Sequence, residues 1–143
     1  MNVVETIQED VHKLTKLLHT LTSQKLSTMG ITRPQALVIR EVLDQTQTIG
    51  QISKAVDLSY STVSGIIDRL EKNGYVQRTR DQEDRRVVWI DKTEKVKEIG
   101  KLIKEMHEQY YQEILSSVSK EELEAFRKTL QILTYNLEQK AIK

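Results

Sequence analysis

Only one part of the chain has the residue pattern of β-strands, and that part is short. Residues 75–80 and 86–90 are rich in β-branched and aromatic residues, and the polar loop of residues 81–84 between them lets the two runs pair as a hairpin. The 143 residues include five glycines and one proline, so the rest of the chain has few places to turn. The sequence therefore predicts a fold dominated by helices, with one β-hairpin.

Apolar residues recur in alternating steps of three and four along both ends of the chain. One repeat covers residues 4–26. Near the other end, Thr93 caps one predicted helix, and a capping box formed by Ser119 and Glu122 opens the last helix, which carries the second repeat. Because three long helices have more apolar surface than one small domain can cover, we expect a homodimer rather than an intramolecular core. The expected dimer-interface residues are Val4, Ile7, Val11, Leu14, Leu123, Phe126, Leu130, Leu133 and Leu137.

The segment in front of the hairpin contains signals for three helices. Thr32 and Pro34 predict a helix start, and a short helix follows at residues 50–56. A break at residues 57–59 precedes a longer helix at residues 60–73, which Ser59 caps and Gly74 ends. The residues expected to face inward are Ile52, Ala55, Val56, Leu58, Val63, Ile66, Ile67 and Leu70.

This order of elements is that of a helix-turn-helix followed by a two-stranded wing. We expect an all-α-dominated fold, α+β only through its wing, with about six helices. Residues 31–92 would form the winged helix-turn-helix domain, flanked by an N-terminal dimerisation helix at residues 1–30 and C-terminal dimerisation helices at residues 93–143.

The second helix of the helix-turn-helix starts with a group of hydroxyl side chains. Packing of Val63 and Ile66 on the preceding helix would leave this first turn projecting. Hydroxyls and unpaired amides at a helix N-terminus suit phosphates and base edges, so we expect this helix to enter a major groove of DNA. The projecting residues expected to bind DNA are Ser59, Tyr60, Ser61, Thr62, Ser64, Gly65 and Arg69.

Charge supports DNA binding only through its placement, because the net charge is +1. We expect one basic surface, with Asp57, Glu71 and Glu83 pointing elsewhere. Because neighbouring strand residues face opposite sides, Arg85 and Arg86 cannot aim the same way. One can enter a minor groove while the other lies on phosphate or pairs with a loop aspartate. The basic residues of this expected surface are Lys54, Arg69, Lys72, Arg78, Arg80, Arg85 and Arg86.

Several stretches resemble the MarR family of transcriptional regulators, in order along nearly the whole chain. They are Gly30-Ile31-Thr32 with Pro34-Gln35, Leu58-Ser59 with Thr62-Val63-Ser64, the run from Ile66 to Lys72 with Gly74, and Asp84-Arg85-Arg86. The resemblance implies a winged-helix dimer held by its first and last two helices. It also implies that Arg86 enters the minor groove and that Asp84 braces it, with Arg85 as the alternative inserting residue.

The chain lacks the residue patterns of an enzyme or a metalloprotein. It has no cysteine, no glycine-rich phosphate loop and no nucleophile elbow. His12 and His19 are ~10.5 Å apart along one helix, and Tyr111 stands where a zinc-protease helix beginning at His107 would need a second histidine. We therefore expect no catalysis, no cofactor and no metal.

Two further patterns bear on localisation and ligands. The longest apolar runs span four residues and the N-terminus carries Glu5 and Glu9, so we expect a cytoplasmic protein without a membrane partner. Aromatic residues at positions 110, 111, 126 and 135 suit a core or interface better than a ligand pocket.

The function expected from these observations is that of a sequence-specific DNA-binding transcriptional regulator. We expect a repressor that binds double-stranded DNA at a pseudo-palindromic operator as a homodimer, with half-sites ~10 bp apart. The resemblance leaves open whether a small-molecule effector releases the DNA. The alternative is a winged-helix protein-protein interaction module without DNA binding.

Overall fold

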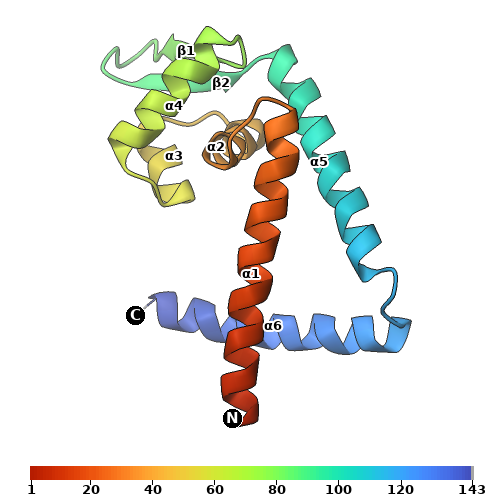
Figure 1. Cartoon of the computed structure of the whole chain (residues 1–143). Coiled ribbons are helices and arrows are strands. Elements are labelled where there is room, and N and C mark those ends of the chain that lie inside the picture. The colour runs from red at the N-terminus through yellow and green to blue at the C-terminus, as the bar shows by residue number, and fades with distance from the viewer. Residues whose placement is uncertain (143) are drawn as a thin grey trace. The chain divides into compact units, whose positions relative to one another are not determined.

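The computed structural model describes residues 1–142 and confirms the predicted fold class within them (Figure 1). Helices dominate, and β1 and β2 pair as one antiparallel hairpin. No helix in this part of the chain is both long and apolar enough to cross a membrane. The elements are, in order, α1 (Val3–Thr28), α2 (Arg33–Asp44), α3 (Ile49–Val56), α4 (Tyr60–Lys72), β1 (Val76–Arg80), β2 (Val88–Lys92), α5 (Glu94–Leu115) and α6 (Lys120–Ile142).

The chain forms two compact units, of which the first is Met1–Ile103 and the second begins at Lys104. In the first unit, α2, α3 and α4 gather beside the hairpin (Figure 1). Each of these elements contributes side chains that are almost fully removed from water, which stabilises the fold by roughly 1.5–3 kcal/mol for each aliphatic side chain. The core residues are Leu26, Val38, Ile39, Val42, Ile52, Val63, Ile67, Leu70, Val76, Ile90 and Val96.

Local capping explains where the first helices begin. Thr32 accepts a hydrogen bond from the Gln35 amide over 3.2 Å, and the Gln35 side chain accepts from the Thr32 amide over 2.9 Å. Thr48 and Gln51 make the same reciprocal pair at the start of α3. The predicted start of α2 is thus confirmed, and α3 begins one residue earlier than the sequence reading placed it.

The break between α3 and α4 has the predicted length. Asp57 ends α3 in the left-handed conformation, at φ 55°, and the Leu58 amide donates to the Ser53 carbonyl oxygen. The expectation that Ala55 faces inward is wrong, because its side chain is exposed. At ~100° per residue, Ala55 lies off the stripe that Ile49 and Ile52 turn toward the core.

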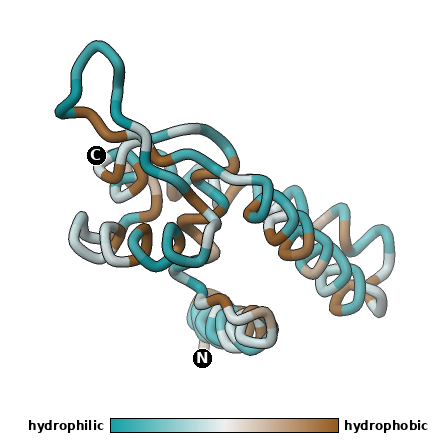
Figure 2. Tube along the Cα trace, turned by 90° about the horizontal axis from the view of Figure 1, so that it is seen from above, coloured by the Kyte–Doolittle hydropathy of each residue, from teal (hydrophilic) through white to brown (hydrophobic). Residues whose placement is uncertain are grey.

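The loop at the tip of the hairpin is longer than the sequence suggested. The strands pair from Val76 opposite Lys92 to Arg80 opposite Val88, so the second strand begins two residues later than predicted. The Asp81 amide donates to the Val87 carbonyl oxygen over 2.9 Å, but the Val87 amide donates within the loop, to the Asp84 carbonyl oxygen over 3.0 Å, so Val87 does not continue the strand. Figure 2 shows this arm ending in a hydrophilic tip.

A third segment that sequence reading missed pairs with the hairpin. Gln47, which lies between α2 and α3 in the chain, exchanges backbone hydrogen bonds with Ile90 over 3.4 and 2.7 Å. Its buried side chain donates to the Glu41 carbonyl oxygen over 3.2 Å. These bonds hold the base of the wing against the helices.

The apolar stripes expected at the dimer interface are largely uncovered in the single chain. The four expected interface residues of α1 each expose at least 49% of their surface: Val4, Ile7, Val11 and Leu14. In α6, which starts where the Ser119 hydroxyl accepts from the Glu122 amide, Leu123 is half-buried. The other α6 residues of the expected interface, Phe126, Leu130, Leu133 and Leu137, are exposed.

Candidate nucleic-acid interface

The first turn of α4 presents a cluster of hydroxyls to solvent. The Ser59 hydroxyl accepts from the Thr62 amide over 3.1 Å and lies 2.7 Å from the Thr62 hydroxyl and 3.2 Å from that of Ser61. Tyr60 is 61% exposed, whereas Val63, Ile67 and Leu70 further along the helix are almost fully buried. Burial of one face therefore holds α4 in place and leaves its N-terminal turn accessible.

Gly65 extends this accessible surface one turn further along α4. A β-carbon at Gly65 would meet no atom within 4 Å, so packing inside the chain does not require glycine there. Glycine in a helix interior costs about 1 kcal/mol relative to alanine. The half-buried Ser64 and the exposed Arg69 lie on either side of Gly65 along the helix. The result is a stretch of helix backbone that another molecule can approach closely.

An ion-pair cluster joins α4 to strand β1. Arg78 donates to Asp68 Oδ1 and to Glu71 Oε1, each over 2.6 Å, and its amide donates to Glu71 Oε2 over 3.3 Å. The bond to Asp68 is the largest cause of a raised pKa for Arg78; partial burial opposes it, and the bond to Glu71 adds to it. The expectation that Glu71 points away from the basic residues is wrong, because it faces Arg78 directly.

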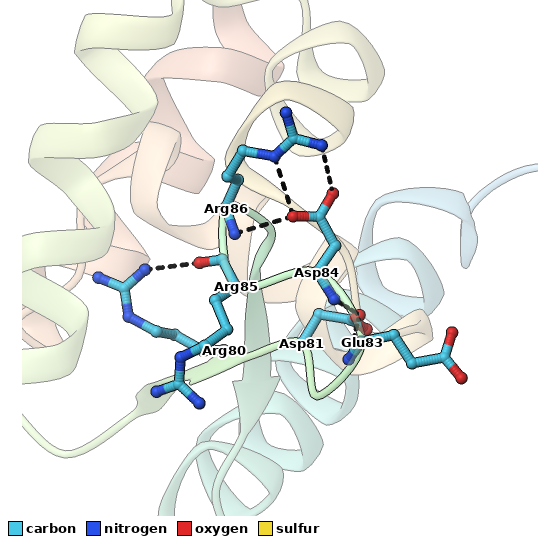
Figure 3. Close-up of polar contacts among 6 residues, drawn as sticks. All are labelled: Arg80, Asp81, Glu83, Asp84, Arg85 and Arg86. Atoms are coloured by element: carbon cyan, nitrogen blue, oxygen red, sulfur yellow. Dashed lines mark hydrogen bonds and ion pairs between the residues drawn. The ribbon is translucent and has the colours of Figure 1, made fainter.

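At the tip of the wing, Arg86 and Asp84 form a two-point ion pair (Figure 3). The Arg86 guanidinium donates to both carboxylate oxygens over 3.0 Å, and the Arg86 amide donates to Oδ1 over 3.1 Å. The side-chain bond from Arg86 is the main reason that the pKa of Asp84 is lowered. Arg86 itself remains 91% exposed, so its side chain is oriented without being buried.

Asp81 organises the rest of the wing loop. Its carboxylate accepts from the Asp84 amide over 2.9 Å and from the Glu83 amide over 3.1 Å. The Trp89 indole donates to the other oxygen over 3.0 Å and is the largest cause of a lowered pKa for Asp81. From the sequence Asp81, like Asp84, was expected only as a partner for a wing arginine, although an aspartate opening a polar turn commonly accepts from the amides that follow.

Arg85 points away from the pair formed by its neighbour (Figure 3). Its carbonyl oxygen accepts from Arg80 over 2.8 Å, and its side chain is exposed. Among the described residues, the Arg85 guanidinium has no carboxylate partner. The loop therefore presents one arginine held by an aspartate and one whose charge is uncompensated.

Side chains of the types that bind metals do not gather in the described part of the chain. No group of three or more histidine, aspartate or glutamate side chains there could hold an ion.

The first turn of α4 and the tip of the wing suit contact with a polyanion, because hydroxyls, a helix N-terminus and exposed guanidinium groups are what such a partner requires.

The fold and site define a winged helix-turn-helix protein, and its relatives identify the family. A model of the MarR family matches residues 29–87. The uncharacterized HTH-type transcriptional regulator YcgE of Bacillus subtilis is 34% identical over 113 residues, which cover 77% of this chain and 70% of that protein. The HTH-type transcriptional regulator YsmB of the same organism, also uncharacterized, is 29% identical over 92% of this chain and 93% of its own. This chain belongs to the MarR family of transcriptional regulators, as the resemblance implied.

Solved structures agree with this assignment. A MarR family protein from Bacillus stearothermophilus is 29% identical, with a TM-score of 0.78 over 96% of this chain and 99% of that one. Streptococcus pneumoniae FabT, whose structure was solved in complex with DNA, is 26% identical, with a TM-score of 0.82 over 95% of this chain and 98% of that one. The family consists of DNA-binding regulators of transcription rather than enzymes.

Proposed function

We propose that this chain represses transcription by binding, as a homodimer, to a pseudo-palindromic DNA operator. The observation that carries the proposal is the exposed first turn of α4, with its hydroxyl cluster, in a domain whose wing ends in the exposed Arg86. A recognition helix and an arginine wing can read adjacent major and minor grooves of one half-site. Blocking access of the polymerase to that site would repress the gene.

In this proposal the residues of α4 read the major groove. Hydroxyls and the open backbone at Gly65 allow close approach to base edges, and the helix N-terminus favours phosphate. Arg69, one turn further on, would contact phosphate or a base. The proposed α4 contacts are Ser59, Tyr60, Ser61, Thr62, Ser64, Gly65 and Arg69.

In the wing, Arg86 would enter the minor groove and Arg85 would lie on phosphate. Asp84 holds Arg86 at two points before DNA arrives, which lowers the side-chain entropy lost on binding. Arg78, expected from sequence to bind DNA, is assigned instead to fastening α4 to β1, because two carboxylates already accept from its guanidinium.

The proposed dimer buries the uncovered stripes of the terminal helices. Val4, Ile7, Val11 and Leu14 in α1 and Leu133 in α6 are apolar and exposed in the single chain. Burying such stripes against a second copy removes apolar surface from water. We keep the division proposed from the sequence, with dimerisation helices at residues 1–30 and 93–143 around a DNA-binding domain at residues 31–92.

Two finer expectations belong to the same proposal. A repressor must reach genomic DNA, so the proposal places the chain in the cytoplasm. We also propose that a small-molecule effector releases the DNA, and such a ligand must bind the free dimer more tightly than the DNA-bound one.

The direct test is selection of bound duplexes from a random-sequence library with the purified protein. We expect the recovered sequences to share an inverted repeat with half-site centres ~10 bp apart. Affinity for such a duplex should fall steeply with salt, because phosphate contacts release counterions. Recovery of no common sequence, together with a flat salt response, would favour the protein-interaction alternative.

A further inference from the structure

The C-terminal end of α4 is closed by side chains from the residues that begin α5. The Lys95 ammonium donates to the carbonyl oxygen of Asn73, the residue that caps α4, over 2.6 Å. The Thr93 hydroxyl lies 2.7 Å from the Gly74 carbonyl oxygen and 3.1 Å from that of Tyr75. Carbonyl groups at a helix end lack partners within the helix, and a cation there also interacts favourably with the helix dipole.

Lys95 makes two further contacts with the turn that follows α4. Its ammonium lies 4.8 Å from the centre of the Tyr75 ring, within the range of a cation-π interaction. Its aliphatic stem covers Gly74, where an added β-carbon would lie 3.7 Å from Lys95 Cδ. Gly74 has φ +80°, so the turn has the left-handed conformation that glycine adopts at little cost. Lys95 thus contacts Asn73 and Tyr75, the residues on either side of Gly74 at the end of α4.

The first turn of α5 is itself anchored, so Lys95 acts from a fixed base. Val96, the next residue, is fully buried in the core of the first unit. On its other side α4 is held to the wing by Arg78. Both attachments act on the C-terminal half of α4, and the hydroxyl-bearing first turn projects beyond them.

We propose that Lys95 is a positioning residue for DNA recognition, which sets the direction of α4 from the first turn of α5. This inference rests on the proposed function of α4. The 13 residues of α4 span ~20 Å, so a tilt of about 10° at its C-terminal end would move its first turn by about 3 Å. A hydrogen bond to a base edge tolerates only a few tenths of an ångström. A loosened C-terminal end would therefore reduce discrimination between sequences more than general affinity for DNA.

The test compares three variants of the full chain. Lys95→Met removes the ammonium and keeps a stem over Gly74, whereas Lys95→Arg keeps the charge. Lys101→Met is the matched control, because it removes the same charge from an exposed position on the same helix. Each variant is titrated with the duplex selected by the wild-type protein and with a scrambled duplex of equal length and composition. Amide hydrogen exchange of residues 70–76 is measured without DNA.

We expect Lys95→Met to lower the ratio of selected to scrambled affinity by about threefold to tenfold, the range of the net contribution of one typical hydrogen bond. Exchange at residues 70–76 should also become faster. Lys101→Met should change neither quantity, and Lys95→Arg should restore most of both. An equal affinity ratio for Lys95→Met and Lys101→Met would overturn the inference, even with faster exchange, because Lys95 would then be only a cap.

Failure of the proposed function is seen separately, in the wild-type protein. If that protein distinguishes no duplex from its scrambled form, the proposed function fails and the positioning role falls with it. If the wild type discriminates and Lys95→Met discriminates equally well, only the positioning role is lost.

Discussion

The guanidinium of Arg86 bonds to both carboxylate oxygens of Asp84 while remaining almost fully exposed at the tip of the wing. This relationship predicts that Arg86→Ala weakens binding to the selected duplex by about 1–3 kcal/mol, because the inserted side chain is lost. Arg85→Ala is the matched control and should cost less, since its contact would be a phosphate. Fluorescence anisotropy at fixed salt measures both. A larger loss for Arg85→Ala would transfer the inserting role to that residue.

The same ion pair predicts a dependence on pH. Bonding to Arg86 holds the pKa of Asp84 below the ordinary aspartate value of 3.8. A lowered carboxylate pKa contributes stability that is complete above the ordinary pKa and is lost as the pH falls through the lowered one. Titration of the Asp84 carboxyl by NMR should therefore give a low midpoint, which Arg86→Gln moves upward. Asp81, whose pKa is lowered mainly by Trp89, should keep its low midpoint in that variant.

Gly65 gives a prediction in which stability and binding change in opposite directions. Gly65→Ala should raise the free energy of unfolding by about 0.5–1 kcal/mol, because the new methyl group enters open space in a helix. The same methyl group should weaken binding to the selected duplex. Gly50→Ala in α3, where a β-carbon also makes no close contact, should leave binding unchanged. Urea unfolding and anisotropy titration test the pair, and unchanged binding by Gly65→Ala would contradict close approach at this position.

A substitution of Arg78 tests whether this residue fastens α4 to β1, as we propose, or binds DNA, as the sequence suggested. If its guanidinium is held by Asp68 and Glu71, Arg78→Met should lower the unfolding free energy by about 1 kcal/mol or less, since the group is partly exposed. The slope of log affinity against log salt should not change. A direct phosphate contact would instead reduce that slope by about 1 for each subunit. Arg85→Ala, measured beside it, should show such a reduction.

The expected dimer is tested by a charge placed in the α6 stripe. Leu133→Glu should give monomers that no longer bind the selected duplex tightly, because a buried carboxylate at a subunit interface lacks a partner. Gln131→Glu adds the same charge at a polar position on the same helix and should remain dimeric. Sedimentation velocity distinguishes the two outcomes, and a dimeric Leu133→Glu protein would remove Leu133 from the interface.

Sequence alone predicts most of the fold because the signals involved are local. Thr32 with Pro34 marks a helix start within three residues, and Gly74 marks a helix end by its own conformation. The pair of Asp84 and Arg86 was implied by the resemblance to the MarR family, whereas the residues alone left open which loop aspartate holds which arginine. Interactions between residues that are close together in the chain can be predicted from the sequence of that segment.

The parts that sequence reading missed depend on contacts between distant segments. Gln47 pairs with Ile90 across the whole helix-turn-helix, and a single bridge leaves no strand pattern to detect. Arg78 pairs with Asp68 and Glu71 because β1 folds back along α4. The sequence does not show which charged side chains of the two elements face one another. Lys95 closes α4 from the next helix for the same reason.

The most direct test of two-site recognition changes only the DNA. Inserting five base pairs between the half-sites of the selected duplex turns them by about half a turn, onto opposite faces of the double helix. A dimer that presents two α4 helices to one face should then bind no more tightly than it binds a scrambled duplex. Binding that is unchanged by the insertion would contradict the account, because each chain would then be reading its site alone.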